Sequence, residues 1–131
     1  MNLTFVTGKT TWSDVNSLMG VNGKPDILFD YDDIHNAITN ILTCPIGTRG
    51  WHPTFGSELP FLIWEPVDMI TASDIKTAII TALARWEPRI TLIGGQSSIT
   101  PLSDGIGYSV ALVYKVNISG SLNSFTFRLT R

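Results

Sequence analysis

Residues 71–93 read TASDIKTAIITALARWEPRITLI, and the spacing of apolar residues changes partway along this stretch. Up to Trp86 the apolar residues recur at every third or fourth position, which is typical of one face of an α-helix. They are Ile75, Ala78, Ile79, Ala82, Leu83 and Trp86. Thr71 and Asp74 form a variant capping box, so we expect the helix to open there.

The pattern changes after the helix because Pro88 cannot continue it. The run Ile90–Ile93 predicts a short strand that Gly94 stops, and Ser97–Thr100 extends the strand pattern. Further along, apolar residues occupy every second position, which is typical of a strand with one apolar face. The first set is Tyr108, Val110, Leu112, Tyr114, Val116 and Ile118, and after a turn at Gly120 the second set is Phe125, Phe127 and Leu129.

Another helix is predicted upstream, with a single apolar stripe and an expected cap at Asp30 or Asp32. The stripe consists of Ile34, Ala37, Ile38, Ile41 and Leu42. Pro45 and Gly47 end this helix. The element order is helix, loop, helix and antiparallel meander. This order predicts an α+β fold with two main helices packed on one face of an antiparallel C-terminal sheet.

Residues 45–66 form a loop longer than the roughly 12–15 residues beyond which loops are usually functional or disordered. Four aromatic side chains argue against disorder, because each ring must be buried against something. They are Trp51, Phe55, Phe61 and Trp64. Residues 61–64 are compatible with one helical turn or a short strand.

Residues 1–30 are rich in turn formers, and we treat them as an N-terminal arm preceding a single domain over residues 31–131. Thr4–Val6 and Ile27–Phe29 are candidate short strands in the arm. Two interpretations stay open: an arm that lies on another surface, or a loosely held terminus.

The composition favours a protein that works among other protein chains. At 131 residues and 14.4 kDa the chain fits one domain, and 44% hydrophobic residues are enough for a core. Charged residues make up only 15%, against about 25% in typical globular domains. Charge keeps a small protein soluble and unassociated, so this shortage suggests an obligate component of an assembly.

Several functional classes are not expected. The net charge is −2 and the lysines are scattered, so nucleic acid is not an expected partner. No apolar run approaches the roughly 18 residues of a membrane span. Cys44 is the single cysteine, and His35 and His52 lie apart, so we expect neither a disulfide nor a metal, and no cofactor. The start of the sequence lacks a signal-peptide pattern, which predicts a reducing, cytosol-like compartment.

Two acidic residues stand in rigid apolar contexts, Trp64-Glu65-Pro66 and Trp86-Glu87-Pro88. A glycosidase needs two carboxylates on either side of one bond, so these residues allow a peptidoglycan hydrolase as an alternative function. A structural use of both glutamates is the favoured interpretation.

In Glu87-Pro88-Arg89 the proline fixes the backbone between two opposite charges. The arginine fork suits either an internal brace between helix and sheet or a clamp onto another chain. The residues alone favour the brace.

The last two predicted strands are long, poor in charge and close together near residue 131. An edge strand leaves a row of unpaired backbone groups, which is a liability unless another chain covers it. Addition of a strand from a partner is therefore the expected use of this sheet.

An ordered set of motifs over about residues 32–130 resembles the small baseplate wedge family of contractile-tailed phages, which carries an old lysozyme-like label and includes a type VI secretion baseplate subunit. The set comprises Asp33-Ile34, Ala37-Ile38 and Ile41-Leu42, then Gly47-Thr48-Arg49, Pro53-Thr54-Phe55-Gly56-Ser57-Glu58-Leu59, Trp64-Glu65-Pro66 and Ala84-Arg85-Trp86-Glu87-Pro88-Arg89-Ile90. The resemblance implies a structural virion protein of the tail baseplate, without enzymatic activity, assembled in the host cytoplasm.

The resemblance also implies roles for individual residues. Glu87, Pro88 and Arg89 would contact the core bundle, a heterodimer of other wedge proteins, which reverses the preference for the brace. The loop and wedge contacts would be Arg49, Pro53, Phe55, Gly56, Trp64, Glu65 and Pro66. A sheath-domain-like sheet would initiate the sheath by receiving a strand of the tail sheath protein along Tyr108, Val110, Leu112, Tyr114, Val116, Phe125, Phe127 and Leu129. Tube or hub proteins are further expected partners.

Overall fold

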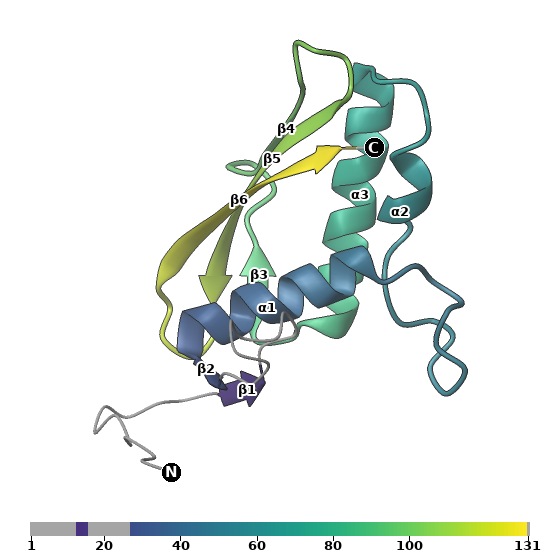
Figure 1. Ribbon diagram of the computed structural model, residues 1–131. Helices are drawn as coiled ribbons and strands as arrows, with labels where there is room; N and C mark the ends of the chain where they lie inside the picture. Colours follow the sequence, from purple (N-terminus) through teal and green to yellow (C-terminus); the bar gives the residue numbers. More distant parts are fainter. Residues whose placement is uncertain (1–12, 16–26, 131) are drawn as a thin grey trace. The chain divides into compact units, whose positions relative to one another are not determined.

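The computed structural model describes residues 13–15 and 27–130 (Figure 1). Its elements are β1 Ser13–Val15, β2 Ile27–Phe29, α1 Asp30–Thr43, α2 Leu59–Leu62, α3 Met69–Trp86, β3 Ile90–Leu92, β4 Ser98–Pro101, β5 Gly107–Val116 and β6 Leu122–Thr130. The chain divides into two compact units within α1, one ending at Ala37 and the other beginning at Ile38. The observed fold is the expected α+β combination of helices with an antiparallel sheet.

In the first unit, β1 and β2 pair in antiparallel fashion, with Ser13 opposite Phe29. The predicted strand Ile27–Phe29 is confirmed, whereas the candidate strand Thr4–Val6 lies outside the described residues. The helix α1 begins at Asp30, so Asp32 lies inside its first turn instead of capping it. An acidic first turn is favourable there because the helix dipole is positive at its N-terminus.

The apolar stripe of α1 is confirmed. Ile34 and Ile38 are fully buried, Ile41 and Leu42 are nearly so, and Ala37 is half-buried. Residues at this spacing share one face of a helix, so a single side of α1 supplies apolar core contacts.

The sheet of the second unit is organised around β5. Along one edge, β6 pairs with β5 from Gly107 opposite Thr130 to Lys115 opposite Leu122. The other edge of β5 carries two short strands at different ends, with β4 beside residues 108–111 and β3 beside residues 114–116. The predicted meander is therefore correct for β4, β5 and β6 but wrong for β3, which pairs with β5 and not with β4.

The turn between β3 and β4 explains this topology. The N–H of Ile93 donates to the carbonyl of Val113 (2.8 Å), and the N–H of Ser97 turns back to the carbonyl of Ile93 (3.0 Å). The hydroxyl of Ser97 then accepts from the N–H of Val113 (3.0 Å). A side-chain oxygen thus takes the place of a backbone acceptor for the Val113 N–H. The chain can therefore pass from β3 to β4 along the same edge of β5 without leaving that N–H unpaired.

The helix α3 starts earlier than the capping-box pattern predicts. Asp68 is its N-cap, and the N–H of Thr71 donates to the Asp68 carboxylate (2.7 Å). Asp68 therefore does the capping that the sequence pattern assigned to Thr71. The helix ends at Trp86, as expected from Pro88. Figure 1 shows α3 running alongside the sheet, where it packs on β3 and β4, with α2 next to it.

The segment between α1 and α2 is a loop closed at its base. The N–H of Ser57 donates to the carbonyl of Cys44 (2.9 Å), and that of Gly47 donates to the carbonyl of Pro53 (2.8 Å). Gly56 has φ +113°, and a Cβ at that position would lie 2.1 Å from the Cys44 carbonyl oxygen, so only glycine fits. In Figure 1 this loop extends away from the helices.

The prediction that each aromatic ring of residues 45–66 is buried is wrong for three of the four. Trp51 at the loop tip is 95% exposed, Trp64 71% and Phe61 57%, while Phe55 is half-buried. Of the two alternatives for residues 61–64, a helical turn or a short strand, the helical turn is present as α2, two residues earlier. Tertiary packing of these rings is not encoded in local sequence, and exposed rings of this size suit a surface that meets another molecule.

Candidate assembly surfaces

The exit of α3 carries a closed ion pair. Both carboxylate oxygens of Glu87 accept from the guanidinium of Arg89, at 2.6 Å from Nε and 2.7 Å from a terminal nitrogen. The Glu87 side chain is only 4% exposed and that of Arg89 is 24% exposed. Pro88 between them is exposed, and its carbonyl accepts from the Asn117 side chain (2.8 Å). Bidentate pairing of this kind fixes both side chains, so the helix exit has one defined shape.

Glu65 and Glu87 do not form a catalytic pair of the kind a glycosidase requires. Glu65 is exposed after α2, while Glu87 is buried with both oxygens engaged by Arg89. A general acid must be able to hold a proton and approach the leaving group. Three hollows among the described residues lie elsewhere, and neither glutamate lines any of them.

The closed loop is fastened to the end of α3 by stacked side chains. The Phe55 ring meets the edge of Trp86 with 5.1 Å between centroids, and the Arg49 guanidinium lies 4.1 Å above the Phe55 ring. Arg85 donates to the hydroxyl of Thr54 (3.2 Å) and lies 5.1 Å from the Trp86 ring centroid. Cation–π contacts of this type add about 0.5–1 kcal/mol each at exposed sites.

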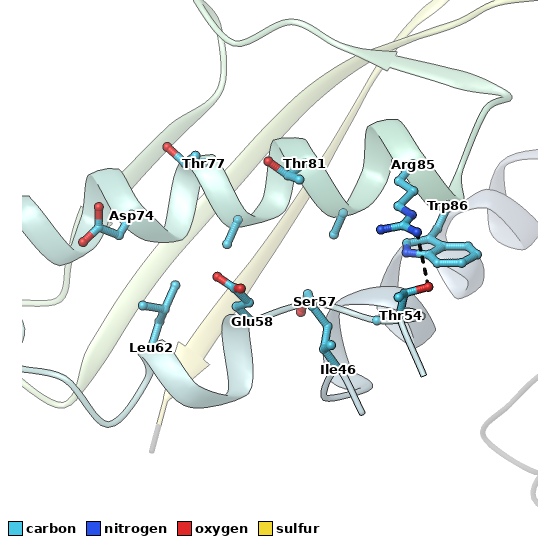
Figure 2. A pocket seen from close by; sticks show the side chains of 13 residues that line it. Ile46, Thr54, Ser57, Glu58, Leu62, Asp74, Thr77, Thr81, Arg85 and Trp86 are labelled. Carbon is cyan, nitrogen blue, oxygen red and sulfur yellow. Dashed lines mark hydrogen bonds between the residues drawn. The ribbon is translucent and has the colours of Figure 1, made fainter. Parts of the chain in front are cut away.

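A hollow of about 350 Å³ separates this loop and α2 from α3 (Figure 2). Figure 2 shows Thr77, Thr81 and Arg85 along α3, with Glu58 pointing toward the helix from the opposite side. The predicted contact residues Arg49, Phe55 and Gly56 therefore belong to one structural element. The roles of Arg85 and Thr54 were not predicted, because a contact between residues 31 positions apart has no local sequence signal.

Three of the four remaining predicted wedge contacts lie near the start of α3. Trp64, Glu65 and Pro66 are all exposed, and the Pro66 carbonyl accepts from the Tyr108 hydroxyl (3.2 Å). Pro53 is exposed in the closed loop. Large apolar side chains that are exposed around α2 and the start of α3 are Phe61, Trp64, Met69 and Ile70. The structure thus places the predicted contacts in two groups, one on the closed loop and one at this apolar surface.

The strand β5 is not available to receive another strand. Its side chains Tyr108, Val110, Leu112, Tyr114 and Val116 are at most 2% exposed, and strands pair with both of its edges. The expectation that these five residues accept a sheath strand is therefore wrong. Their alternating pattern marks the protein's own core.

The strand β6 is the edge of the sheet. The N–H of Val116 donates to the carbonyl of Ser121 (2.9 Å). Because hydrogen-bonding direction alternates along an antiparallel ladder, the backbone groups of Asn123, Phe125, Phe127 and Leu129 point toward β5. Those of Leu122, Ser124, Thr126, Arg128 and Thr130 point away, and in the described part of the chain no strand pairs with them.

Two features protect this edge. The N–H of Ser124 donates to the Asn123 side chain (2.8 Å), so a local bond occupies one outward donor. Arg128 places a positive charge on the same edge. Local bonds and charges of this kind discourage unspecific pairing of exposed strand edges.

In the part of the chain that the structure describes, the surroundings clearly shift the pKa of two titratable groups. Burial lowers the pKa of His35, with the nearby Asp32 carboxylate opposing that shift. The backbone N–H of Thr71 lowers the pKa of the Asp68 carboxyl by stabilising its charged form. Both groups lie at or near the starts of helices. Among the described residues no cluster of His, Cys, Asp and Glu is suited to hold a metal ion.

Comparison with known proteins decides the family. A family model described as baseplate wedge protein gp25 matches residues 30–94. Baseplate protein W of Escherichia phage P2 is 34% identical over 110 residues, which span 82% of this chain and 92% of that protein. The chain belongs to the gp25 baseplate wedge family. The gp25 protein of Enterobacteria phage T4 is 25% identical, over 80% of each chain.

Solved structures share the fold of this gp25-family chain. A Geobacter sulfurreducens structure named a tail lysozyme has a TM-score of 0.66 at 23% identity, covering 75% of this chain and 87% of that chain. A chain in the cryo-EM structure of the postcontracted pyocin R2 baseplate has a TM-score of 0.57 at 22% identity, covering 92% and 99%. No helix in the described segments is both long and apolar enough to cross a membrane.

Proposed function

We propose that this protein is a structural subunit of the baseplate wedge in a contractile tail, located in the virion and assembled in the host cytoplasm. The observation that carries the proposal is the 34% identity to a baseplate protein over nearly its full length. The engaged carboxylate of Glu87 gives a hydrolase no support. The role we propose is assembly, without catalysis or cofactor. Its partners are other wedge proteins, the tail sheath protein, and tube or hub proteins.

Within the baseplate, β6 is the strand onto which the first sheath ring adds a strand. Its outward N–H and C=O groups, including those of Thr126 and Arg128, are arranged as β-augmentation requires. This narrows the sheath contact to Phe125, Phe127, Leu129 and their neighbours on β6.

A proline at Thr126 tests the strand addition. Thr126→Pro removes an outward N–H, which an edge strand tolerates, while Thr126→Ala keeps that N–H and serves as the matched control. Electron microscopy of assembled particles should show baseplates without sheath for the proline variant and sheathed tails for the alanine variant. Normal sheath on Thr126→Pro particles, with the substitution confirmed, would exclude β6 as the template.

The helix exit Glu87-Pro88-Arg89 and the surface around Trp64 are the proposed contacts with the wedge core bundle and its neighbours. The exposed Pro88 and partly exposed Arg89 give a partner access to a rigid, charged corner. The closed pair also acts as an internal brace, so both functions are assigned to the same residues.

Replacing Arg89 separates these two functions. Arg89→Ala leaves the buried Glu87 carboxylate without its guanidinium, which should lower the free energy of unfolding by about 1–3 kcal/mol. Adding Glu87→Gln removes the stranded charge and should restore much of that stability, as urea unfolding will show. Both variants should still fail to co-purify with the wedge heterodimer. If the double variant co-purifies with the wedge heterodimer as well as the wild type does, the clamp function is excluded and only the brace remains.

A further inference from the structure

The closed loop, residues 44–58, carries the most exposed large apolar side chain in the described part of the chain. Trp51 is 95% exposed, whereas the next such side chain, Ile70, is 75% exposed. An indole surrounded by water contributes nothing to the core. Tryptophan is also among the residues that contribute most to binding when they enter a pocket on a partner. The size and exposure of Trp51 therefore suit a residue that enters another protein.

The loop holds Trp51 on an ordered support. Hydrogen bonds close its base, and the N–H of Phe55 donates to the carbonyl of His52, the residue after Trp51 (3.0 Å). The Phe55 ring in turn meets the Trp86 ring at the end of α3, with 5.1 Å between centroids. A support that is ordered before binding reduces the entropy lost on association, so one exposed side chain can contribute strongly to affinity.

The arginines next to this support have no acidic partner. Residues 44–57 contain no Asp or Glu, and their one arginine is Arg49. Its guanidinium lies 4.1 Å above the Phe55 ring, and no described carboxylate pairs with it. Arg85, at the other side of the same stack, donates to the Thr54 hydroxyl and also pairs with no described carboxylate. Each guanidinium has five N–H donors, so both keep donors available for carboxylates of another molecule.

We propose that Trp51 anchors the contact with the wedge proteins by entering an apolar slot whose rim carries carboxylates. The inference rests on the proposed function and adds the anchoring residue and the chemistry of the partner surface. A concave surface can bury both faces of an indole at a loop tip, whereas a flat surface covers only one. Arg49 and Arg85 stand beside the stack behind the tip, and an acidic rim complements them because guanidinium binds carboxylate in bidentate fashion.

The position of the loop favours the wedge proteins as this partner. The loop is fastened to Trp86, which directly precedes Glu87-Pro88-Arg89, the corner proposed to contact the core bundle. A wedge protein bound at this corner lies next to the attachment of the loop. Nucleic acid is a weaker match for an exposed ring beside arginines, because it needs several clustered cations and this chain has a net charge of −2.

The test measures the affinity of the purified wedge heterodimer for variants of this chain. Trp51→Ala removes the anchor and should weaken binding at least about 20-fold. Ile118→Ala is the matched control, because Ile118 is 71% exposed after β5, outside the proposed wedge contacts, and its loss should change the affinity less than about twofold. Urea unfolding should show unchanged stability for both, since both side chains are exposed. Equal affinities for wild type and Trp51→Ala would overturn the proposal.

Arg49→Gln tests the acidic rim. It should weaken binding about threefold or more at low salt and make the affinity less dependent on salt, since screened charge pairs carry that dependence. Lys115→Gln removes an exposed charge on β5 and is the control, for which we expect the salt dependence of the wild type. An unchanged salt dependence with Arg49→Gln would exclude carboxylates around the slot.

Fluorescence measures the insertion itself. The signal of Trp51 is the difference between wild type and Trp51→Phe, each with and without the heterodimer. Burial in an apolar slot should shift this emission to shorter wavelength and protect it from acrylamide quenching. An emission that stays water-like in the complex would overturn insertion even where Trp51→Ala weakens binding.

The remaining outcomes separate this inference from the proposed function. If the double variant Arg89→Ala, Glu87→Gln loses the heterodimer while Trp51→Ala keeps it, the wedge contact stands without the anchor. A wild-type chain that does not bind the heterodimer would overturn both. A homodimer of the isolated chain, or a complex with a single-stranded oligonucleotide, that Trp51→Ala abolishes while heterodimer binding persists would assign the loop to that other partner.

Discussion

The strands β5 and β6 have the same kind of sequence and opposite roles. Both place an apolar residue at every second position, and they pair along nearly their whole length. Along β5 these residues are buried, and other strands pair with both edges of β5. Along β6 no residue is fully buried. An alternating pattern therefore identifies a face of a strand, while the neighbours of the strand decide whether it becomes core or interface.

The strongest test of this contrast removes a leucine from each strand. Leu112→Ala on β5 deletes a side chain that is 2% exposed and should lower the free energy of unfolding by about 2–5 kcal/mol. Leu122→Ala on β6 deletes one that is 60% exposed and should change it by less than about 0.5 kcal/mol. Urea titrations followed by circular dichroism will measure both. Equal losses would mean that β6 is packed as firmly as β5.

A smaller effect is expected where the two backbones approach each other. A Cβ on Gly107 would lie 2.1 Å from the Leu129 carbonyl oxygen, so Gly107→Ala must push β6 away from β5. We expect a loss of about 1–3 kcal/mol, typical of overpacking. Gly95→Ala, where nothing lies within 4 Å of the added Cβ, is the control and should be nearly neutral. Thermal unfolding of the two variants decides the matter, and a neutral Gly107→Ala would contradict the observed register.

The smallest predicted effect concerns the hydrogen-bonded link between Tyr108 on β5 and Asp68 at the start of α3. Among the described contacts, β6 has no such link to a helix. The N–H of Asp68 donates to the Tyr108 hydroxyl (3.2 Å), and the Asp68 carboxylate caps α3. Asp68→Ala should lower Tm by about 3 °C near neutral pH, whereas Asp68→Asn, which keeps an acceptor, should lower it less.

This capping effect should depend on pH in a defined direction. Because the folded-state pKa of Asp68 lies below its ordinary value of 3.8, its charged form adds stability above that value. The added stability is lost as pH falls through the lowered pKa. The Tm difference between wild type and Asp68→Ala should accordingly be constant above about pH 5 and shrink in stronger acid. A difference that grows in acid would show that the carboxylate does not cap the helix.

Much of the fold could be predicted because its signals are local. The periodic apolar residues of α1, α3, β5 and β6 predict these elements, and Pro88 predicts the end of α3. The pairing of β3 with β5 could not be predicted, since it depends on Ser97 supplying a hydroxyl to Val113 across the sheet. The earlier start of α3 was missed because Asp68 and Thr71 are both residue types that cap helices well, and the observed cap is Asp68.

The candidate surfaces were predicted less completely. The resemblance to a known family drew attention to Glu87-Pro88-Arg89 and to the final strands, but only the register shows that β6 and not β5 is open. The contact between Arg85 and Thr54 and the hollow between the closed loop and α3 arise from residues far apart in the chain. No spacing rule in the sequence brings such residues together.

The geometry of β6 also has a mechanical consequence. Its hydrogen bonds to β5 run perpendicular to the strand, from Asn123 to Leu129. A pull directed along the strand loads all of these bonds in parallel, so they must yield together, whereas a pull that peels Thr130 outward would break them one after another. A molecule that holds β6 through a second ladder would transmit a lengthwise pull into the core of this protein as shear, the loading direction in which the sheet is strongest.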